Sequence, residues 1–423
     1  MLTYGRLYPA AASLMAYGWA TPAAIGIGLW LISRTSQIPL LHTTILTSAG
    51  IIWNLGVLLG TCGILIGDGQ PFELLEFPSY ATFVLFVAFA MIAVWVLFTA
   101  WYARNNKFTL AQTFVILAFL SFPWLFCSAN LAILWKPIQA PAQGVVAAWY
   151  FGGFNNLWLG AVAIGALFYL IPKAVDRPIF SETLGRLSFW TFLLFAAWTG
   201  MARYVGGPFP AWLTSAGVVA SVLVLIPTFS IVLNIHMTMQ GQYRVAGWCP
   251  TVRFLAVGIF SFVFAAVFAA INALPVVSAV TNFSEAIKTQ QILGFYGFFS
   301  MVAFGAIYYI LPRTNNWEWP CSSLIHWHFW LVFAGIILGT VSTFLGGFLQ
   351  GFALYDVTNT FRSSVDFVTP FLFLNVISAL LILTSNVAFA SQFVLMLLKS
   401  GKHKSGPTLL AEPIETSHEP AAV

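Results

Sequence analysis

The sequence predicts an all-α integral membrane protein, a polytopic bundle of about eleven transmembrane helices. The composition is the first reason, because 60% of the residues are hydrophobic and only 7% are charged. Soluble domains carry about 25% charged residues, so this chain has too few to cover a water-facing surface. The second reason is that apolar runs of about 20 residues recur along the chain. In lipid only helices or closed barrels satisfy the backbone internally, and these runs are too long and too uniformly apolar for barrel strands.

The apolar runs place the helices in chain order. The first, 9–33, is too long for the apolar core of a signal peptide and has only Arg6 ahead of it, so we expect it to stay in the protein. Ten further spans are expected at 42–67, 80–103, 110–134, 146–171, 187–204, 211–237, 254–274, 291–311, 324–348 and 368–397. The chain then divides into a short extracytoplasmic N-terminus (1–8), a transmembrane domain (9–397) and a disordered cytoplasmic tail (398–423) whose composition is polar.

Basic residues are distributed unequally between alternate loops. One side collects Arg34, Arg104, Lys107, Lys173, Arg177, Arg186, Arg244, Arg253, Arg313, Lys399, Lys402 and Lys404, and the other has Arg6, Lys136, Arg203, Lys288 and Arg362. Short loops rich in Lys and Arg stay cytoplasmic, which predicts an outside N-terminus and a cytoplasmic C-terminus.

The isoelectric point near 9.0 follows from this bias and does not indicate nucleic-acid binding. The four cysteines show no CxxC spacing, so neither a disulfide framework nor a zinc site is expected.

Short motifs recur beside the predicted spans. They are Gly5-Arg6-Leu7-Tyr8-Pro9, Ile171-Pro172-Lys173 with Arg177-Pro178, Trp198-Thr199-Gly200, Leu311-Pro312-Arg313, His328-Phe329-Trp330-Leu331 and Gln350-Gly351. In order and spacing they resemble subunit I of the haem-copper oxidase superfamily, closest to the cbb3-type cytochrome c oxidase, over nearly the whole chain. The family's first transmembrane helix precedes the Gly-Arg-Leu motif, so the resemblance implies that this helix is missing here. Eleven spans then place the N-terminus outside, in agreement with the charges.

The resemblance implies metal ligands that this sequence does not supply. Imidazole nitrogens bind haem iron and copper in the family, and oxygen is reduced between a haem and a copper held by three histidines. The expected low-spin haem ligand falls on Ala11, the copper histidines on Gly152, Ala202 and Arg203, and the two axial haem ligands on Ile287 and Thr289. The fifth, sixth and ninth predicted spans contain no histidine, so no shift of register restores the set. No catalytic residue and no bound cofactor are therefore expected, with haem b and copper present only if the family activity is retained.

The remaining polar residues allow simpler interpretations. We expect structural roles for His42, His236, His326 and His328, and a solvated tail for His403 and His418. Arg203 has two open interpretations. It either occupies the vacated polar pocket or binds a carboxylate there, or it snorkels to the outer headgroups from the end of its span.

Three functions follow as hypotheses from the resemblance and the missing ligands. The first is a degenerate, non-catalytic subunit I that acts as a membrane scaffold in a respiratory or electron-transfer complex of the bacterial inner membrane. Its partners would be a membrane-anchored c-type cytochrome or other respiratory subunits. The second is an active cbb3-type oxidase subunit with atypical ligands. The third is a transporter or quinone-binding membrane protein that reuses the emptied cavity.

Overall fold

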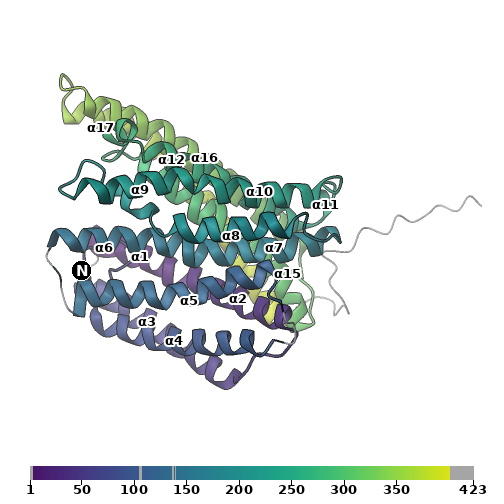
Figure 1. Cartoon of the computed structure of the whole chain (residues 1–423). Coiled ribbons are helices and arrows are strands. Elements are labelled where there is room, and N and C mark those ends of the chain that lie inside the picture. Colours follow the sequence, from purple (N-terminus) through teal and green to yellow (C-terminus); the bar gives the residue numbers. More distant parts are fainter. Residues whose placement is uncertain (1–2, 104–106, 136–137, 139, 401–423) are drawn as a thin grey trace, which may run out of the picture.

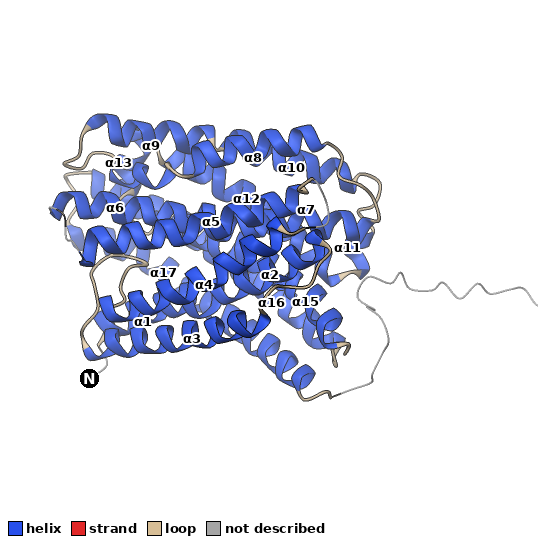
Figure 2. Ribbon diagram, turned by 60° about the horizontal axis from the view of Figure 1, so that its bottom comes forward, coloured by secondary structure: helices blue, strands red, loops and turns tan. Residues whose placement is uncertain are grey.

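The computed structural model describes residues 3–103, 107–135, 138 and 140–400, and every regular element in these ranges is helical (Figure 2). Among the described residues, ten helical segments are long and apolar enough to cross a membrane: Tyr4–Ser36, Thr43–Ile66, Ser79–Trp101, Leu110–Trp135, Pro141–Val175, Ala211–Met239, Pro250–Asn272, Ala286–Asn315, Ser322–Tyr355 and Phe361–Leu397. The predicted all-α membrane bundle is confirmed.

Five of these segments are single helices and five are composite. The single ones are α3 (Thr43–Ile66), α4 (Ser79–Trp101), α12 (Pro250–Asn272), α16 (Ser322–Tyr355) and α17 (Phe361–Leu397). The composite ones join α1 (Tyr4–Ser13), η1 (Leu14–Ala20) and α2 (Thr21–Ser36); α5 (Leu110–Asn130) and η2 (Leu131–Trp135); α6 (Ala140–Gly153), η3 (Phe154–Gly160) and α7 (Ala161–Val175); α9 (Ala211–Leu223) and α10 (Leu225–Met239); and α14 (Ala286–Gln291), η5 (Ile292–Ser300) and α15 (Met301–Asn315). The short α11 (Val245–Trp248) and α13 (Pro275–Thr281) lie in connections.

The sixth predicted span, 187–204, differs from expectation. It forms α8 (Glu182–Ala196), a break, and the 3₁₀ helix η4 (Thr199–Tyr204). At 1.5 Å per residue α8 is only about 22 Å long, shorter than the roughly 30 Å hydrocarbon core. The sixth predicted span is therefore broken and is not among the ten segments above, and the break places η4 against α6 and α9.

The last two helices are longer than predicted. They form a hairpin in which α16 and α17 extend to about 51 and 56 Å, well beyond the bilayer thickness. Figure 1 shows the closed end of this hairpin projecting past the bundle on the side where the N-terminus lies. The tenth span was predicted to end at 348 and the eleventh to begin at 368, because polar residues lie between these positions. The helical backbone nevertheless continues into this region from both sides.

Within the described residues, four π-helical segments, η1, η2, η3 and η5, lie in the long helical segments. Three of them, η1, η3 and η5, begin two or three residues after Ala11, Gly152 and Thr289, which are positions where the family resemblance expects a metal ligand. π-Helical turns are rare and concentrate at functional sites. The backbone around the expected metal positions therefore has a feature typical of a functional centre. Arg104, Lys136, Lys402, Lys404, His403, His418 and the tail from residue 401 lie outside the described residues.

Candidate functional site

Gly152, an expected copper-ligand position, lies in the contact between α6 and η4. A Cβ atom at Gly152 would lie 2.7 Å from the backbone nitrogen of Gly200 and 2.9 Å from its Cα. A Cβ atom at Gly200 would collide with the carbonyl oxygen of Ala148. The two backbones are packed directly against each other, so this position has no space for an imidazole ring.

The second and third copper positions, Ala202 and Arg203, lie in η4, which α9 holds from the other side. Ala202 is buried, and a Cβ atom at Gly217 of α9 would collide with its backbone nitrogen. Ala202 contributes only a methyl group to this interface. The broken sixth span is thus held between two neighbouring helices at the segment that would carry a pair of copper ligands.

The Arg203 side chain binds a carboxylate. Its Nη2 atom lies 3.1 Å from Oε2 of Glu73, and its guanidinium carbon lies 4.0 Å from the ring centre of Phe151. The other oxygen of Glu73, Oε1, accepts a hydrogen bond of 2.7 Å from Nε2 of Gln291. This geometry agrees with the first interpretation of Arg203, in which the side chain binds a carboxylate.

The two axial haem positions lie on the short helix α14. Thr289 is buried, and its hydroxyl donates a 2.9 Å hydrogen bond to the hydroxyl of Thr343 in α16. Ile287 lines a polar cavity of about 700 Å³. The backbone of α14 is pressed against α16, because a Cβ atom at Gly347 would collide with the nitrogen of Ala286. Neither axial position presents a nitrogen or sulfur ligand.

Ala11, the expected low-spin haem position, is exposed on α1. It lies one helical turn before Met15, which lines an apolar groove of about 1000 Å³ between α2, α15 and α17. Ala11 brings no donor atom to this groove.

Three of the described histidines make ordinary packing or hydrogen-bond contacts. The Nδ1 atom of buried His328 lies 2.7 Å from the hydroxyl of Tyr308. The ring of His236 contacts Tyr243, and that of His42 packs 4.1 Å from Trp95. Among the described residues, no three His, Cys, Asp or Glu side chains lie close enough to hold a metal ion. The residues present do not fit the haem and copper of the family, which require several nitrogen ligands at set positions.

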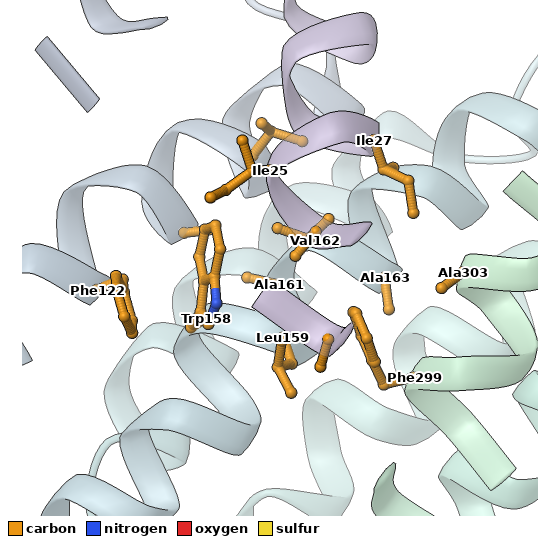
Figure 3. Packing of buried hydrophobic residues seen from close by; sticks show 14 of the residues in the cluster. Ile25, Ile27, Phe122, Trp158, Leu159, Ala161, Val162, Ala163, Phe299 and Ala303 are labelled. Carbon is orange, nitrogen blue, oxygen red and sulfur yellow. The ribbon is translucent and has the colours of Figure 1, made fainter. Parts of the chain in front are cut away.

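Aromatic rings fill the interior beside these positions. Trp158 of η3 packs against Phe122 of α5 with ring centres 5.1 Å apart, and Tyr17 of η1 packs against Phe154 at 5.6 Å. The hydroxyl groups of Tyr17 and Tyr150 lie 2.7 Å apart. Figure 3 shows Trp158 and Phe122 packed among aliphatic side chains of the same cluster. Such tilted and edge-to-face ring contacts are the favourable arrangements for a dense protein core.

A polar cavity that the sequence analysis missed lies between the start of α1, the 67–78 loop and α14. Its wall carries charged and polar groups from Arg6, Glu73, Glu76, Lys288 and Gln291. Glu76 is only 6% exposed, and its Oε2 accepts a 2.9 Å hydrogen bond from the hydroxyl of Ser13. The one available signal was the pair of acidic residues, Glu73 and Glu76, in a short loop between two apolar spans.

Burial raises the pKa of the Glu76 carboxyl to about 7, with a smaller contribution from the charge of Glu73; hydrogen bonds from the backbone and from Ser13 act in the opposite direction. The folded state therefore binds a proton that the unfolded state has released above pH 4.5. The resulting stability is fully present below that pH and is lost as the pH rises through about 7, in total on the order of 3 kcal/mol. We expect the apparent melting temperature in detergent to fall as the pH rises from about 5 to about 7.5 and to change little above that pH.

Glu76→Gln should remove most of this pH dependence, because the amide stays neutral and its oxygen still accepts from Ser13. The matched control is Glu182→Gln at the exposed start of α8, which should keep the wild-type slope. Equal slopes for the wild type and Glu76→Gln would contradict the assignment to Glu76.

Comparison with known proteins agrees with this architecture. A family model described as "Cytochrome C and Quinol oxidase polypeptide I" matches residues 1–382. The chain is 23% identical over 414 residues to a cytochrome c oxidase subunit 1 homolog of Agrobacterium tumefaciens (strain T37), covering 93% of this chain and 76% of the relative. It is 25% identical over 360 residues to the cbb3-type cytochrome c oxidase subunit CcoN1 of Stutzerimonas stutzeri, covering 82% and 75%.

A solved structure has the same fold. It is described as a cryo-EM structure of a heme-copper terminal oxidase dimer, and it matches with a TM-score of 0.77 at 13% identity over 97% of this chain and 80% of the other. The resemblance inferred from the loop motifs is confirmed. This chain is an integral membrane protein of the cytochrome c and quinol oxidase polypeptide I family, and a divergent relative of the cbb3-type subunit I.

Proposed function

We propose that this chain is a pseudo-oxidase: a subunit I-like membrane scaffold that binds neither haem nor copper at the family positions and does not itself reduce oxygen. The observation that carries the proposal is the backbone contact between Gly152 and Gly200. This contact removes the space for one copper ligand. At the other positions Ala11, Ala202, Ile287 and Thr289 supply no imidazole, and coordination chemistry has few substitutes for several missing imidazoles.

The family also suggests where the scaffold works. We propose that it lies in a bacterial inner membrane with its N-terminus outside, and that it assembles with a membrane-anchored c-type cytochrome or other respiratory subunits. The uneven distribution of basic loop residues supports this orientation. The most apolar stretch of α17 is only 11% buried, so its exposed surface is available for contact with such a neighbour.

One observation favours the alternative of an active subunit with atypical ligands. The Nε2 atom of His328 is buried without a hydrogen-bond partner, as an unoccupied metal ligand would be. The ring is enclosed by Phe254, Phe304 and Phe389, with centres 4.4–5.2 Å away. Because His328 belongs to no group of three or more His, Cys, Asp or Glu side chains that could hold a metal ion in the described structure, this alternative is the weaker one.

The reduced-minus-oxidised visible spectrum of the purified chain, with pyridine haemochrome and copper assays, tests the proposal. We expect no b-type haem and no copper per chain, both for the chain alone and after subtracting the haem of any co-purifying cytochrome. A haem-copper oxidase purified in the same detergent is the positive control. Stoichiometric haem b would overturn the proposal, and His42→Ala, His236→Ala and His328→Ala would then identify the ligand.

A further inference from the structure

The apolar groove beside Met15 is lined by polar groups that lack a hydrogen-bond partner. Ser300 of η5 lines it and is 1% exposed, and its hydroxyl is buried without a partner in the described structure. Asn386 of α17 also lines it, and its amide forms no hydrogen bond with a described residue. Its polar neighbours Thr384 and Ser391 each donate to a carbonyl oxygen of the preceding turn. Leaving such groups unpaired away from water costs free energy, so a partner from outside the described chain would stabilise both.

Ser300 and Asn386 lie at the same level along the groove. The helix α16 runs between α15 and α17 with short connections at both ends, so α15 and α17 run in the same direction. Phe304 follows Ser300 by four residues and Phe389 follows Asn386 by three, which places each pair on one helix face. The rings of Phe304 and Phe389 lie 4.9 Å apart. The two unpaired groups therefore both lie about one turn before this ring contact.

Trp19 of η1 adds a third donor from the opposite wall. It lines the groove, and its ring centre lies 5.0 Å from that of Phe304 and 6.1 Å from that of Phe389. Its indole N–H forms no hydrogen bond with a described residue. A hydroxyl, a primary amide and an indole can all donate to one kind of acceptor, a carbonyl oxygen. The aromatic rings beside these donors suit a flat ring.

The depth of these donors selects an uncharged ligand. Asn386 lies 11 residues before Leu397, the last residue of α17, and this distance is about 16 Å. Lys399, two residues further on, belongs at the membrane surface, where lysine keeps its ammonium group in water. The hydrocarbon core is about 30 Å thick, so Asn386 lies near its middle. A charged group is costly at that depth, which excludes a phospholipid headgroup and allows an uncharged carbonyl.

We propose that Ser300, Asn386 and Trp19 form a binding site for an uncharged, lipid-soluble carbonyl compound with a flat ring, of the quinone class. Its carbonyl oxygen would accept hydrogen bonds from these donors. Its ring would lie against Phe304 and Phe389, and its apolar tail would extend along the groove. The proposal concerns binding and includes no electron transfer. It goes beyond the scaffold function and does not depend on it.

The test is binding of decylubiquinone to the full chain in phosphatidylcholine nanodiscs. The bound quinone is extracted and quantified by chromatography, and the amount taken up by empty nanodiscs is subtracted. We expect saturation at a single molecule per chain. Decylbenzene has a flat ring and the same tail but no carbonyl, and should bind roughly tenfold or more weakly, because it leaves the donors unpaired. The infrared carbonyl band of bound decylubiquinone should lie at lower frequency than in empty nanodiscs, because a hydrogen bond weakens the C=O bond.

Two variants test the named donors. Ser300→Ala and Asn386→Leu should each weaken decylubiquinone binding about three- to tenfold, because each removes one hydrogen bond. In both variants the carbonyl band should move back towards its position in empty nanodiscs. A purely structural role of these side chains would not move this band.

Matched controls separate loss of the donors from misfolding. Ser391→Ala removes an exposed hydroxyl of α17 that donates to the Val387 carbonyl. Asn54→Leu removes an exposed amide of α3 that donates to the Gly50 carbonyl. Neither residue lines the groove, so both controls should bind decylubiquinone as the wild type does. All four variants should keep the wild-type gel-filtration profile.

Three results would overturn the proposal. They are equal binding of decylubiquinone and decylbenzene, binding that neither Ser300→Ala nor Asn386→Leu weakens, and binding no greater than in empty nanodiscs. Because the readout is bound quinone, it is independent of the haem spectrum that tests the scaffold function, and the two proposals can fail separately.

Discussion

Gly152→His is expected to destabilise the protein by more than about 4 kcal/mol instead of restoring a copper ligand. The new Cβ would lie 2.7 Å from the backbone nitrogen of Gly200, and a backbone atom inside a helix contact cannot move aside as a flexible side chain does. Overpacking against side chains costs about 1–3 kcal/mol, and losses above about 4 kcal/mol are confined to a few severe mechanisms. The thermal unfolding temperature in detergent and the yield of monodisperse protein measure the effect.

The same contact gives a second variant that involves no metal chemistry. Gly200→Ala adds one methyl group, which would collide with the carbonyl oxygen of Ala148, and should be nearly as damaging. Gly144→Ala on the same helix α6 is the control, because its nearest neighbour is the hydroxyl oxygen of Tyr204 at 3.4 Å. That substitution should be neutral or slightly stabilising, since alanine favours a helix over glycine by about 1 kcal/mol. A Gly152→His protein that folds normally and binds copper would show that the position is still a metal site.

The sequence predicted the fold class because a membrane imposes a length and an apolar composition on every spanning helix. It did not predict the break in the sixth span, 187–204, since the break after Ala196 depends on tertiary contacts of η4 that hydropathy does not report. The ends of α16 and α17 were missed for a related reason. Helical backbone continues into polar residues when a partner helix supports it.

The candidate site was predicted only in part. Missing histidines could be read from the sequence because ligand identity is a property of single residues. The backbone contact at Gly152 could not be read from the sequence, since it brings Gly200 of η4 against Ala148 and Gly152 of α6. The carboxylate that binds Arg203 comes from Glu73, 130 positions away, and the burial of Glu76 likewise follows from a loop that folds over α1.

Trp158→Ala is expected to cost about 3–5 kcal/mol, the range for removing a large buried aromatic side chain. Trp158 is fully buried and contacts the rings of Phe89, Phe119 and Phe122 at 5.1–5.3 Å. Its indole nitrogen also donates to the hydroxyl of Thr21 at 3.4 Å. The cavity left by the indole would be lined by these aromatic rings on several sides. Thermal unfolding in detergent measures the loss.

Trp190→Ala is the matched control, because Trp190 on α8 is 66% exposed and its removal leaves no internal cavity. We expect it to change stability by less than about 1 kcal/mol, as surface substitutions do. The contrast tests how the interior is stabilised. If the chain binds no prosthetic group, as we propose, the aromatic side chains must supply the packing energy of the interior, and removing one large ring should lower stability. If Trp158→Ala lowered the stability no more than Trp190→Ala, the aromatic rings would contribute little to the packing of the core. A bound molecule would then have to supply that stability.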